Sequence, residues 1–317
     1  MDYSSLETVL QTIATGIIVG TNYGLMCLGL GMIFGVMRVI NFAQGEFLTM
    51  GMYFCLVVVT ALASRQPAGY AWIIATAALA VPVFYLVGVA IDRLALARVT
   101  GANVLNAEDG GHSPQLILTL GLSLMLQSAG LMLFGSTPNS VRTAQSTSAL
   151  HLGPLWGDEI YLFLNQARLF SAIIAVMVAL ALAVFIRRTR WGRELRAAAA
   201  NPVAATYLGI DVARQYMRAF GIGVALTAVA GVLMATYQPF QPYTGQDFTV
   251  IMYAGVVLGG MGSIGGAFWG GLILGWLQQM STLFIPLQLQ TTSIFVAFIL
   301  ILILRPQGLF GKVTERA

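Results

Sequence analysis

The chain has 317 residues, of which 58% are hydrophobic and only 9% carry a charge. Soluble domains carry roughly 25% charged residues, so this composition excludes a soluble protein and indicates an integral membrane protein. The net charge of +4 comes mostly from one arginine-rich segment, so it reports orientation in the membrane and not nucleic-acid binding. The apolar runs are long and alternating strands are absent, so we expect an all-α, multi-pass bundle.

The whole chain, 1–317, is expected to form a single transmembrane domain of eight or nine helices. No stretch is long and polar enough for a soluble domain, so we expect any energy source to belong to a partner chain. Nine crossings require that the seventh and eighth runs each cross the bilayer. The expected spans are 9–36, 42–63, 70–91, 114–135, 168–186, 219–236, 249–261, 265–283 and 290–304.

The first run carries small residues on one face and two polar residues, Asn22 and Tyr23, near its middle. Small residues at four-residue spacing allow close contact with another helix. Asn22 either makes an interhelical hydrogen bond or lines a solute pathway. The small residues are Gly16, Gly20, Gly24, Gly31 and Gly35.

The segment 38–46 begins the second span and carries a carboxylate at membrane depth, Glu46. Asn41 can cap the helix, and Gln44 can reach back to it in a capping box. Because a helix N-terminus stabilises a carboxylate, Glu46 is either a structural cap, paired with Arg38, or an ionisable group on the solute or gating path. We favour a structural and gating role over direct contact with solute.

The fourth span contains Thr119 and Gln127 as its polar members. Gln127 is expected to hydrogen-bond to another helix, and a role on the pathway is the alternative. Cys27 and Cys55 lie inside apolar runs, so they predict neither a disulfide nor a metal site.

Two polar segments differ in charge, so we expect them on opposite faces of the membrane. The segment 136–165 has few arginines and is expected to be a polar external loop. The segment 187–218 has seven arginines against Glu194 and Asp211, which the positive-inside rule assigns to the cytosol.

Within 187–218 the residue order predicts a short helix over 202–208, preceded by an alanine-rich turn over 194–200. Asn201 is expected as the N-cap, Pro202 as the first helical residue and Gly209 as the residue that ends the helix. Such a helix suits docking into another protein. The alternative is a basic loop that anchors two helices to anionic lipid headgroups.

The stretch 255–275 is dense in glycine, and each interior glycine costs a helix about 1 kcal/mol relative to alanine. We therefore expect a break near 262–266, which includes Gly262, Ser263 and Gly265. The glycines either serve tight helix packing or mark a discontinuous span whose freed backbone groups line a cavity.

Four motifs together resemble the permease subunits of branched-chain amino acid ABC importers, with the closer match to the smaller, H-type subunit. Many members carry histidine where this chain has Gln44, so a titrating role at that position is not available. The glycine run of the third motif resembles the amino-acid branch more than the urea and short-amide branch. The motifs are GVMRVINFAQGE at 35–46, NP with LGID at 201–211, VLGGMGSIGG at 257–266 and RPQGLFG at 305–311.

The resemblance implies a type II-like importer permease in the bacterial inner membrane. Its implied partners are a second, M-type permease, two cytosolic ABC ATPases and a periplasmic substrate-binding protein. This chain would bind no cofactor, since the ATPases use ATP and Mg. By the resemblance, 193–209 matches the coupling region that sits in a groove of the ATPase.

The resemblance and the residue patterns together give two sets of candidate residues, with none expected for catalysis or metal binding. The ATPase-coupling candidates are Arg193, Glu194, Arg196, Asn201, Pro202, Ala204, Ala205, Leu208, Gly209 and Asp211. The pathway and gating candidates are Asn22, Tyr23, Asn41, Gln44, Glu46, Thr119, Gln127, Gly262, Ser263 and Gly265.

Three alternatives come from the same residues. A urea or short-amide importer permease belongs to the same family. An ion-coupled secondary transporter needs ionisable groups buried in its spans, and Glu46 is the clear candidate. A membrane-embedded enzyme would need a nucleophile–base pair or a metal constellation, and His112 and His151 lie in separate loops.

Overall fold

The computed structural model describes residues 3–62, 69–98, 113–141, 143, 148–155, 160–286, 289–305 and 307–311. His112 and parts of 136–165 lie outside these residues. The elements, in chain order, are α1 (Tyr3–Met37), α2 (Gln44–Leu62), α3 (Tyr70–Ile91), the π-helix η1 (Asp92–Leu96), α5 (Ser113–Phe134), β1 (Ala149–Leu155), β2 (Ile160–Asn165), α6 (Gln166–Arg188), α7 (Arg190–Ala200), α8 (Pro202–Tyr207), α9 (Val212–Met234), α10 (Thr244–Gly259), α11 (Ile264–Ser281) and α12 (Gln290–Leu304).

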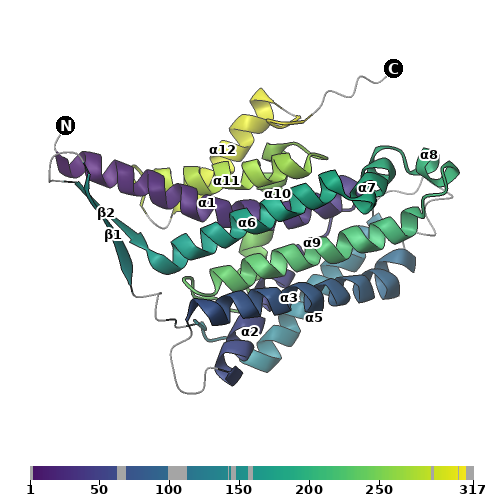
Figure 1. Cartoon of the computed structure of the whole chain (residues 1–317), viewed down its shortest axis with the longest axis horizontal. Helices are drawn as coiled ribbons and strands as arrows, with labels where there is room; N and C mark the ends of the chain where they lie inside the picture. Colours follow the sequence, from purple (N-terminus) through teal and green to yellow (C-terminus); the bar gives the residue numbers. More distant parts are fainter. Residues whose placement is uncertain are drawn as a thin grey trace.

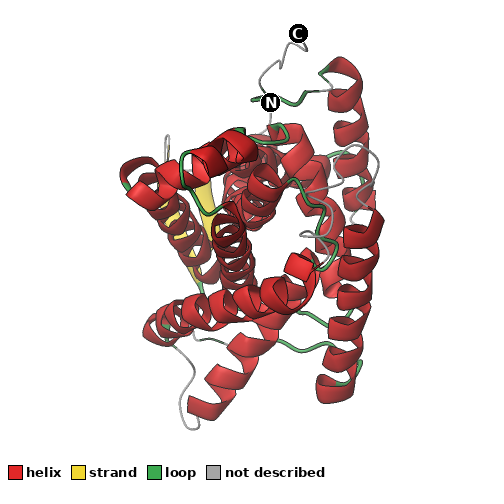
Figure 2. Cartoon of the chain, turned by 90° about the vertical axis from the view of Figure 1, so that its right-hand side faces the viewer, coloured by secondary structure: helices red, strands yellow, loops and turns green. Residues whose placement is uncertain are grey.

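The two ends of the bundle carry different elements. α7 and α8 lie at one end, which we call the coupling end, and β1 and β2 lie at the other (Figure 1). Seen from the coupling end, the two strands lie behind the helices (Figure 2). This arrangement matches the expectation that 187–218 and 136–165 face opposite sides of a membrane.

Six of the described helices are long and apolar enough to cross a membrane, which agrees with the expected all-α, multi-pass bundle. α10 and α11 form a further apolar pair, bent by 119° at a break, and α12 is a shorter apolar helix of 15 residues. The expected count of eight or nine is therefore approximate. Eight is reached when the bent pair counts as one span and α12 as another, and nine only if α10 and α11 each cross.

α1 is the central helix, and its glycines set how closely its neighbours approach. A Cβ added to Gly20 would overlap the carbonyl of Leu272 in α11, and one added to Gly275 would lie 2.5 Å from the Cα of Gly20. On another side of α1, Gly29 lies against Thr227 of α9. In lipid the hydrophobic effect does not drive helices together, so van der Waals contact between closely packed backbones stabilises their association. The small face predicted for the first span is confirmed.

β1 and β2, at 149–155 and 160–165, form a pair of antiparallel strands, which corrects the expected polar loop there and the statement that strands are absent. β1 and β2 pair antiparallel, with an irregularity between Leu152 and Leu155. A two-stranded sheet is at best marginally stable alone, and here α1 supports it. The Gln11 side chain accepts a hydrogen bond from Phe163 N at 3.0 Å and donates one to the Phe163 carbonyl. β1 contains glycine, proline and histidine, so its sequence lacks the regular alternation of apolar and polar residues that predicts a strand.

Replacing Gly20 with alanine is expected to destabilise the bundle, because the added Cβ meets backbone that cannot rotate away. Overpacking of this kind costs about 1–3 kcal/mol. Gly121→Ala in α5 is the matched control, since a Cβ there meets no atom within 4 Å. The midpoint of thermal unfolding in detergent should fall for Gly20→Ala alone. Equal midpoints would show that the α1–α11 contact does not limit stability.

Candidate functional site

The arginine-rich segment folds into two short helices joined at Asn201. The side-chain oxygen of Thr189 caps α7 by accepting a hydrogen bond from Gly192 N at 3.1 Å. Asn201 ends α7, since its N–H donates to the Ala197 carbonyl at 3.1 Å. It also begins α8, since its side-chain oxygen accepts from Ala204 N at 2.9 Å. The predicted N-cap at Asn201 is confirmed.

α8 lies where the sequence predicts it to within one residue. Pro202 is the first helical residue, as expected, and the helix ends at Tyr207, just before Leu208. Gly209 follows with a φ of +78°, a left-handed conformation that glycine adopts without steric cost.

The alanine-rich stretch 194–200 is helical, and the expected turn there is wrong. It forms the second half of α7, in which Leu195 and Ala198 are buried. Alanine has the highest helix propensity of all residues, and the buried side chains give the helix a packed face. A run of alanines next to a helix N-cap therefore belonged to the preceding helix.

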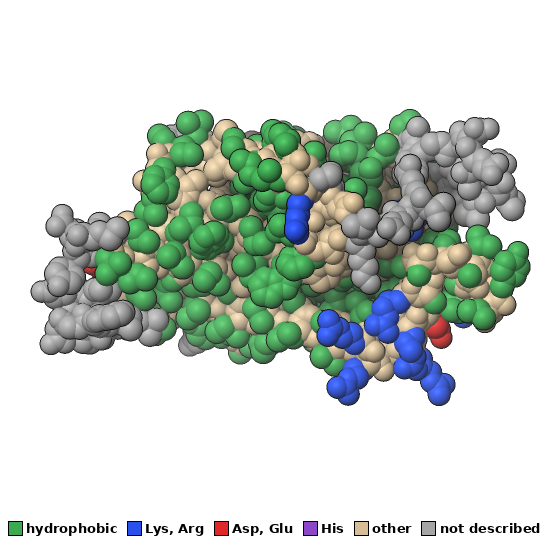
Figure 3. Space-filling view, turned by 90° about the horizontal axis from the view of Figure 1, so that it is seen from above, with side chains coloured by type: hydrophobic (Ala, Val, Ile, Leu, Met, Phe, Trp, Pro, Cys, Tyr) green, Lys and Arg blue, Asp and Glu red, His purple; other side chains and the backbone are tan. Residues whose placement is uncertain are grey.

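The coupling surface, by which we mean the exposed side chains of 187–209, combines positive charge with exposed apolar groups. The arginines from 187 to 196 are exposed, and most Lys and Arg side chains on the face shown gather at this end (Figure 3). Tyr207 is 86% exposed and Leu208 is 79% exposed, whereas Ala205 is only 2% exposed. This surface can offer both hydrophobic contact and charge to a partner.

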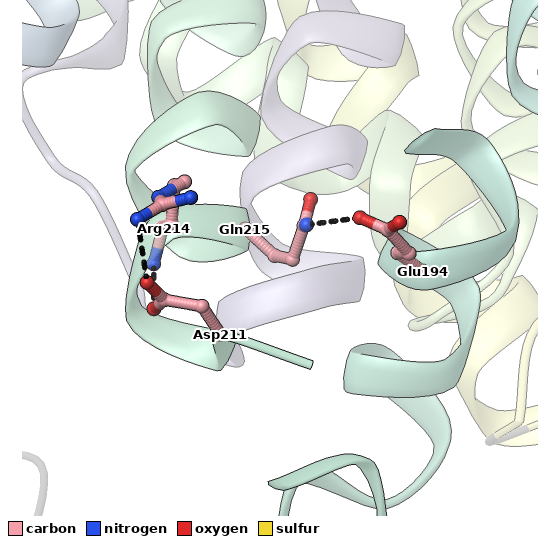
Figure 4. Close-up of polar contacts among 4 residues, drawn as sticks. All are labelled: Glu194, Asp211, Arg214 and Gln215. Carbon is pink, nitrogen blue, oxygen red and sulfur yellow. Dashed lines mark hydrogen bonds and ion pairs between the residues drawn. The ribbon is translucent and has the colours of Figure 1, made fainter. Parts of the chain in front are cut away.

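A partly buried polar contact ties α7 to α9. Gln215 is buried, and its Nε2 donates to Glu194 Oε2 at 2.8 Å (Figure 4). At the start of α9, Asp211 accepts a hydrogen bond from Arg214 N at 3.0 Å and forms an ion pair with the Arg214 guanidinium at 3.3 Å. The coupling surface is thus linked to a helix that runs through the core.

A second site lies where α5 meets the starts of α2 and α10. In 114–134 the three buried residues are Thr119, Ser123 and Gln127, all polar and four residues apart. They therefore lie on one face of α5, which we call the polar seam. The rest of α5 is partly or fully exposed.

Each seam residue hydrogen-bonds to a different part of the chain. The Thr119 hydroxyl donates to the Ile40 carbonyl at 3.4 Å, in the segment before α2. The Ser123 hydroxyl donates to Glu46 Oε1 at 3.4 Å. Gln127 Oε1 accepts from Gln246 Nε2, in the first turn of α10, at 3.1 Å. The interhelical hydrogen bond predicted for Gln127 is confirmed.

Glu46 is 2% exposed and lies in the first turn of α2. The expected pair with Arg38 is absent from the ion pairs of the described residues, where Arg214–Asp211 alone is found. The N-terminus of α2 favours a negative charge at this position, and Ser123 donates to the carboxylate. Next to it, Gly45 of α2 and Gly245 of α10 are in backbone contact, so the two helices begin side by side.

Asn41 and Gln44 fix the start of α2, but not through the expected capping box. The Asn41 side-chain oxygen accepts from Ala43 N at 3.1 Å, and its amide donates to Gln44 Oε1 at 2.9 Å. The Gln44 amide in turn donates to Thr227 Oγ1 at 2.5 Å and to the Gly223 carbonyl at 3.2 Å. Gln44 therefore ties α2 to α9 instead of returning to the backbone of Asn41.

The remaining pathway candidates lie at other interfaces. Asn22 accepts a hydrogen bond from the Ser171 hydroxyl of α6 at 2.7 Å, so the predicted interhelical hydrogen bond is present. Tyr23 packs its ring edge-on against Phe248 of α10. Ser263 caps α11 by accepting from Gly266 N at 3.1 Å. Gly262 and Gly265 lie at this break, where a Cβ on either would meet no atom within 4 Å.

Three site residues, Ser123, Gln246 and Gln215, are not among the candidates that the sequence predicts. Ser123 could have been found, because it completes a four-residue spacing between Thr119 and Gln127 that marks one helix face. Gln246 and Gln215 meet partners more than 20 residues away, so no local pattern identifies them.

Comparison with known proteins places this geometry in a family. The model of the branched-chain amino acid transport system / permease component family matches residues 12–304. The chain belongs to this permease family. It is 31% identical over 316 residues to the high-affinity branched-chain amino acid transport system permease protein LivH of Escherichia coli K12, covering 96% of each chain.

Other relatives carry different names. The chain is 30% identical to the high-affinity branched-chain amino acid transport system permease protein BraD of Pseudomonas aeruginosa, covering 96% of each chain. It is 28% identical to the autoinducer 2 import system permease protein LsrC of an Enterobacter species, covering 80% of this chain and 77% of the relative. No solved structure matches the chain.

Replacing Gln215 with leucine is expected to weaken the attachment of α7 to α9, because it removes the amide that donates a hydrogen bond to the Glu194 carboxylate. A hydrogen bond to a charged group contributes about 1.5–3 kcal/mol, so trypsin should cleave at the α7 arginines at least about tenfold faster. Gln246→Leu, which breaks a hydrogen bond far from α7, is the control. Identical cleavage of both variants in inverted membrane vesicles would contradict the link.

Proposed function

We propose that this chain is a permease subunit of an ATP-driven importer for branched-chain or other hydrophobic amino acids. The similarity to LivH over 96% of each chain carries this proposal. The proposed location is the cytoplasmic membrane of a bacterium, with the coupling end in the cytosol. Its arginine content supports this orientation through the positive-inside rule.

The proposed partners follow from the surfaces of the molecule. The coupling surface would dock into a cytosolic ATPase, with Tyr207 and Leu208 supplying hydrophobic contact and the arginines supplying charge. A second, M-type permease would complete the pathway, and two ATPases would use ATP and Mg. A periplasmic binding protein would deliver the solute, so affinity would reside outside this chain. The alternative, a basic loop that only anchors two helices to lipid headgroups, does not require the ordered pair of helices α7 and α8.

The polar seam is the proposed route for solute. A zwitterionic amino acid carries two charges, and the interior of a bilayer is costly for each. Hydroxyl and amide groups at Thr119, Ser123 and Gln127 offer weak, neutral contacts that let a solute enter and leave. Hydrogen bonds and side-chain packing, including the stack of Phe134 on the Tyr53 ring of α2, hold α5 in place. Because α5 lacks the close glycine packing found between α1 and α11, the seam would open at a lower cost than that contact.

A second candidate solute class is favoured by the similarity to LsrC. Reconstitution with the cognate ATPases, partner permease and binding protein in liposomes would test both. Leucine uptake that requires ATP hydrolysis supports the proposal, and uptake of autoinducer 2 alone would move the solute to the LsrC class. Uptake driven by a proton or sodium gradient without ATPases would instead make the chain a secondary transporter.

Replacing Ala204 with arginine is expected to abolish uptake while leaving membrane insertion intact. Ala204 is exposed on α8, so a long charged side chain there would keep α8 out of a protein groove without disturbing the fold. Ala205→Arg is a poorer probe, since Ala205 is buried. Phe284→Arg, in the exposed turn after α11, is the control. Normal uptake and copurified ATPases with Ala204→Arg would contradict docking at α8.

Replacing Glu46 with glutamine is expected to leave uptake largely intact and its pH dependence unchanged. ATP-driven transport needs no coupling proton, and the glutamine oxygen can still accept the Ser123 hydrogen bond. Glu46→Leu should lower uptake, since it removes the acceptor and orphans a buried hydroxyl. Solute uptake measured from pH 5 to 8 checks both variants. A pH profile that collapses in Glu46→Gln alone would favour the proton-coupled alternative.

A further inference from the structure

Two sequence motifs that are far apart in the chain meet at the bend between α10 and α11. We call the bend, residues 259–264, the elbow. Gly260 and Gly262 there have φ angles of +103° and +98°. A Cβ on Gly35, near the last turn of α1, would lie 3.7 Å from the Gly262 carbonyl oxygen. Since α1 ends close to α7, the elbow lies toward the coupling end of the molecule.

The segment 307–311 supplies the hydrogen bonds that the end of α10 lacks. The last carbonyls of a helix have no partner within the helix. Here the Leu258 carbonyl accepts from Leu309 N at 2.8 Å, and the Gly259 carbonyl accepts from Phe310 N at 3.2 Å. At the start of α11, the Ser263 hydroxyl oxygen accepts a hydrogen bond from Gly266 N at 3.1 Å. Both helix ends at the elbow are therefore satisfied, one of them from outside the helix pair.

The contact between the two motifs leaves no room for a side chain. Gly308 has a φ of +79°, and a Cβ added to it would lie 2.5 Å from the Cα and N of Gly260. A Cβ added to Gly260 would lie 2.5 Å from Gly311 N. Glycine is required on both sides, for its backbone conformation and for the close approach.

We propose that residues 307–311 act as a strap that stays docked on the elbow and fixes the angle between α10 and α11 during transport. α11 lies along α1 through glycine contacts, and α1 reaches the coupling end. A fixed elbow would transmit movement of the coupling surface to α1, α10 and the seam, whereas a loose elbow would absorb it. The strap makes Gly260, Gly308, Leu309 and Phe310 positioning residues. This role rests on the proposed ATP-driven transport.

Gly308→Ala tests the strap, with Gly135→Ala as the matched control. Gly135, just after α5, has a φ of +75°, close to that of Gly308, but a Cβ there meets no atom within 4 Å. In liposomes that hold the complete transporter, Gly308→Ala should lower the leucine moved per ATP hydrolysed about tenfold, a common size for coupling between sites. Copurified ATPase should be unchanged, and Gly135→Ala should stay within about twofold. An unchanged ratio for Gly308→Ala overturns the proposal.

A second experiment, covalent crosslinking, tests the strap even if Gly308→Ala fails to fold. Met261 and Phe310 are 57% and 49% exposed and flank the contact. Met261→Cys and Phe310→Cys, with Cys27 and Cys55 replaced by alanine, would be joined by a short bismaleimide. Transport should persist after linking, because the strap stays docked, and loss of transport would show that it must release. If no ATPase copurifies with the wild-type chain, the proposed function fails. The fraction of chains that the bismaleimide joins still shows whether the strap is docked on the elbow.

Discussion

Contact between helix backbones at glycine is the constraint on which the rest of the structure depends. The chain has 35 glycines and few charges, and a bilayer offers helices little hydrophobic reason to associate. Where Gly20 meets Leu272, or Gly275 meets Gly20, the absence of Cβ atoms brings α1 and α11 into direct contact. The same holds between α2 and α9 at Gly231. These helices form the fixed part of the molecule.

α5 is held in another way, and this difference has a mechanical consequence. Its buried face consists of Thr119, Ser123 and Gln127, which make hydrogen bonds of 3.1–3.4 Å to the α2 and α10 regions. A hydrogen bond contributes a net of about 0.5–1.5 kcal/mol, and a solute or water can replace it. The stack of Phe134 on the Tyr53 ring adds side-chain contact between α5 and α2. Because α5 lacks the close backbone packing of α1 on α11, we expect that separating α5 from α2 costs less than separating α1 from α11.

Local sequence signals predicted local structure well. The N-cap Asn201, the terminator Gly209 and the small face of α1 each depend on residues within one or two turns, and the structure has all three. The stretch 194–200, expected as a turn, is the second half of α7, because the high helix propensity of alanine extends the helix up to the cap at Asn201. The partner of Gln44 and the contact between Gly260 and Gly308 depend on residues distant in the chain, which no local pattern specifies. For the site, the sequence predicts Glu46, Thr119 and Gln127 as pathway candidates. It does not predict that these three lie close together, or that Asn22 instead hydrogen-bonds to α6.

Hydrogen bonds already occupy backbone groups at the elbow, and this restricts where in the molecule a solute can be bound. A break in a glycine-dense span frees carbonyls that could line a cavity, and that was one expectation for 262–266. The carbonyls of Leu258 and Gly259 are instead occupied by the strap, and the start of α11 is capped by Ser263. Polar groups able to exchange partners are found instead on side chains of the seam. The elbow therefore suits a mechanical role, and the seam is the better place for weak contacts with a zwitterion.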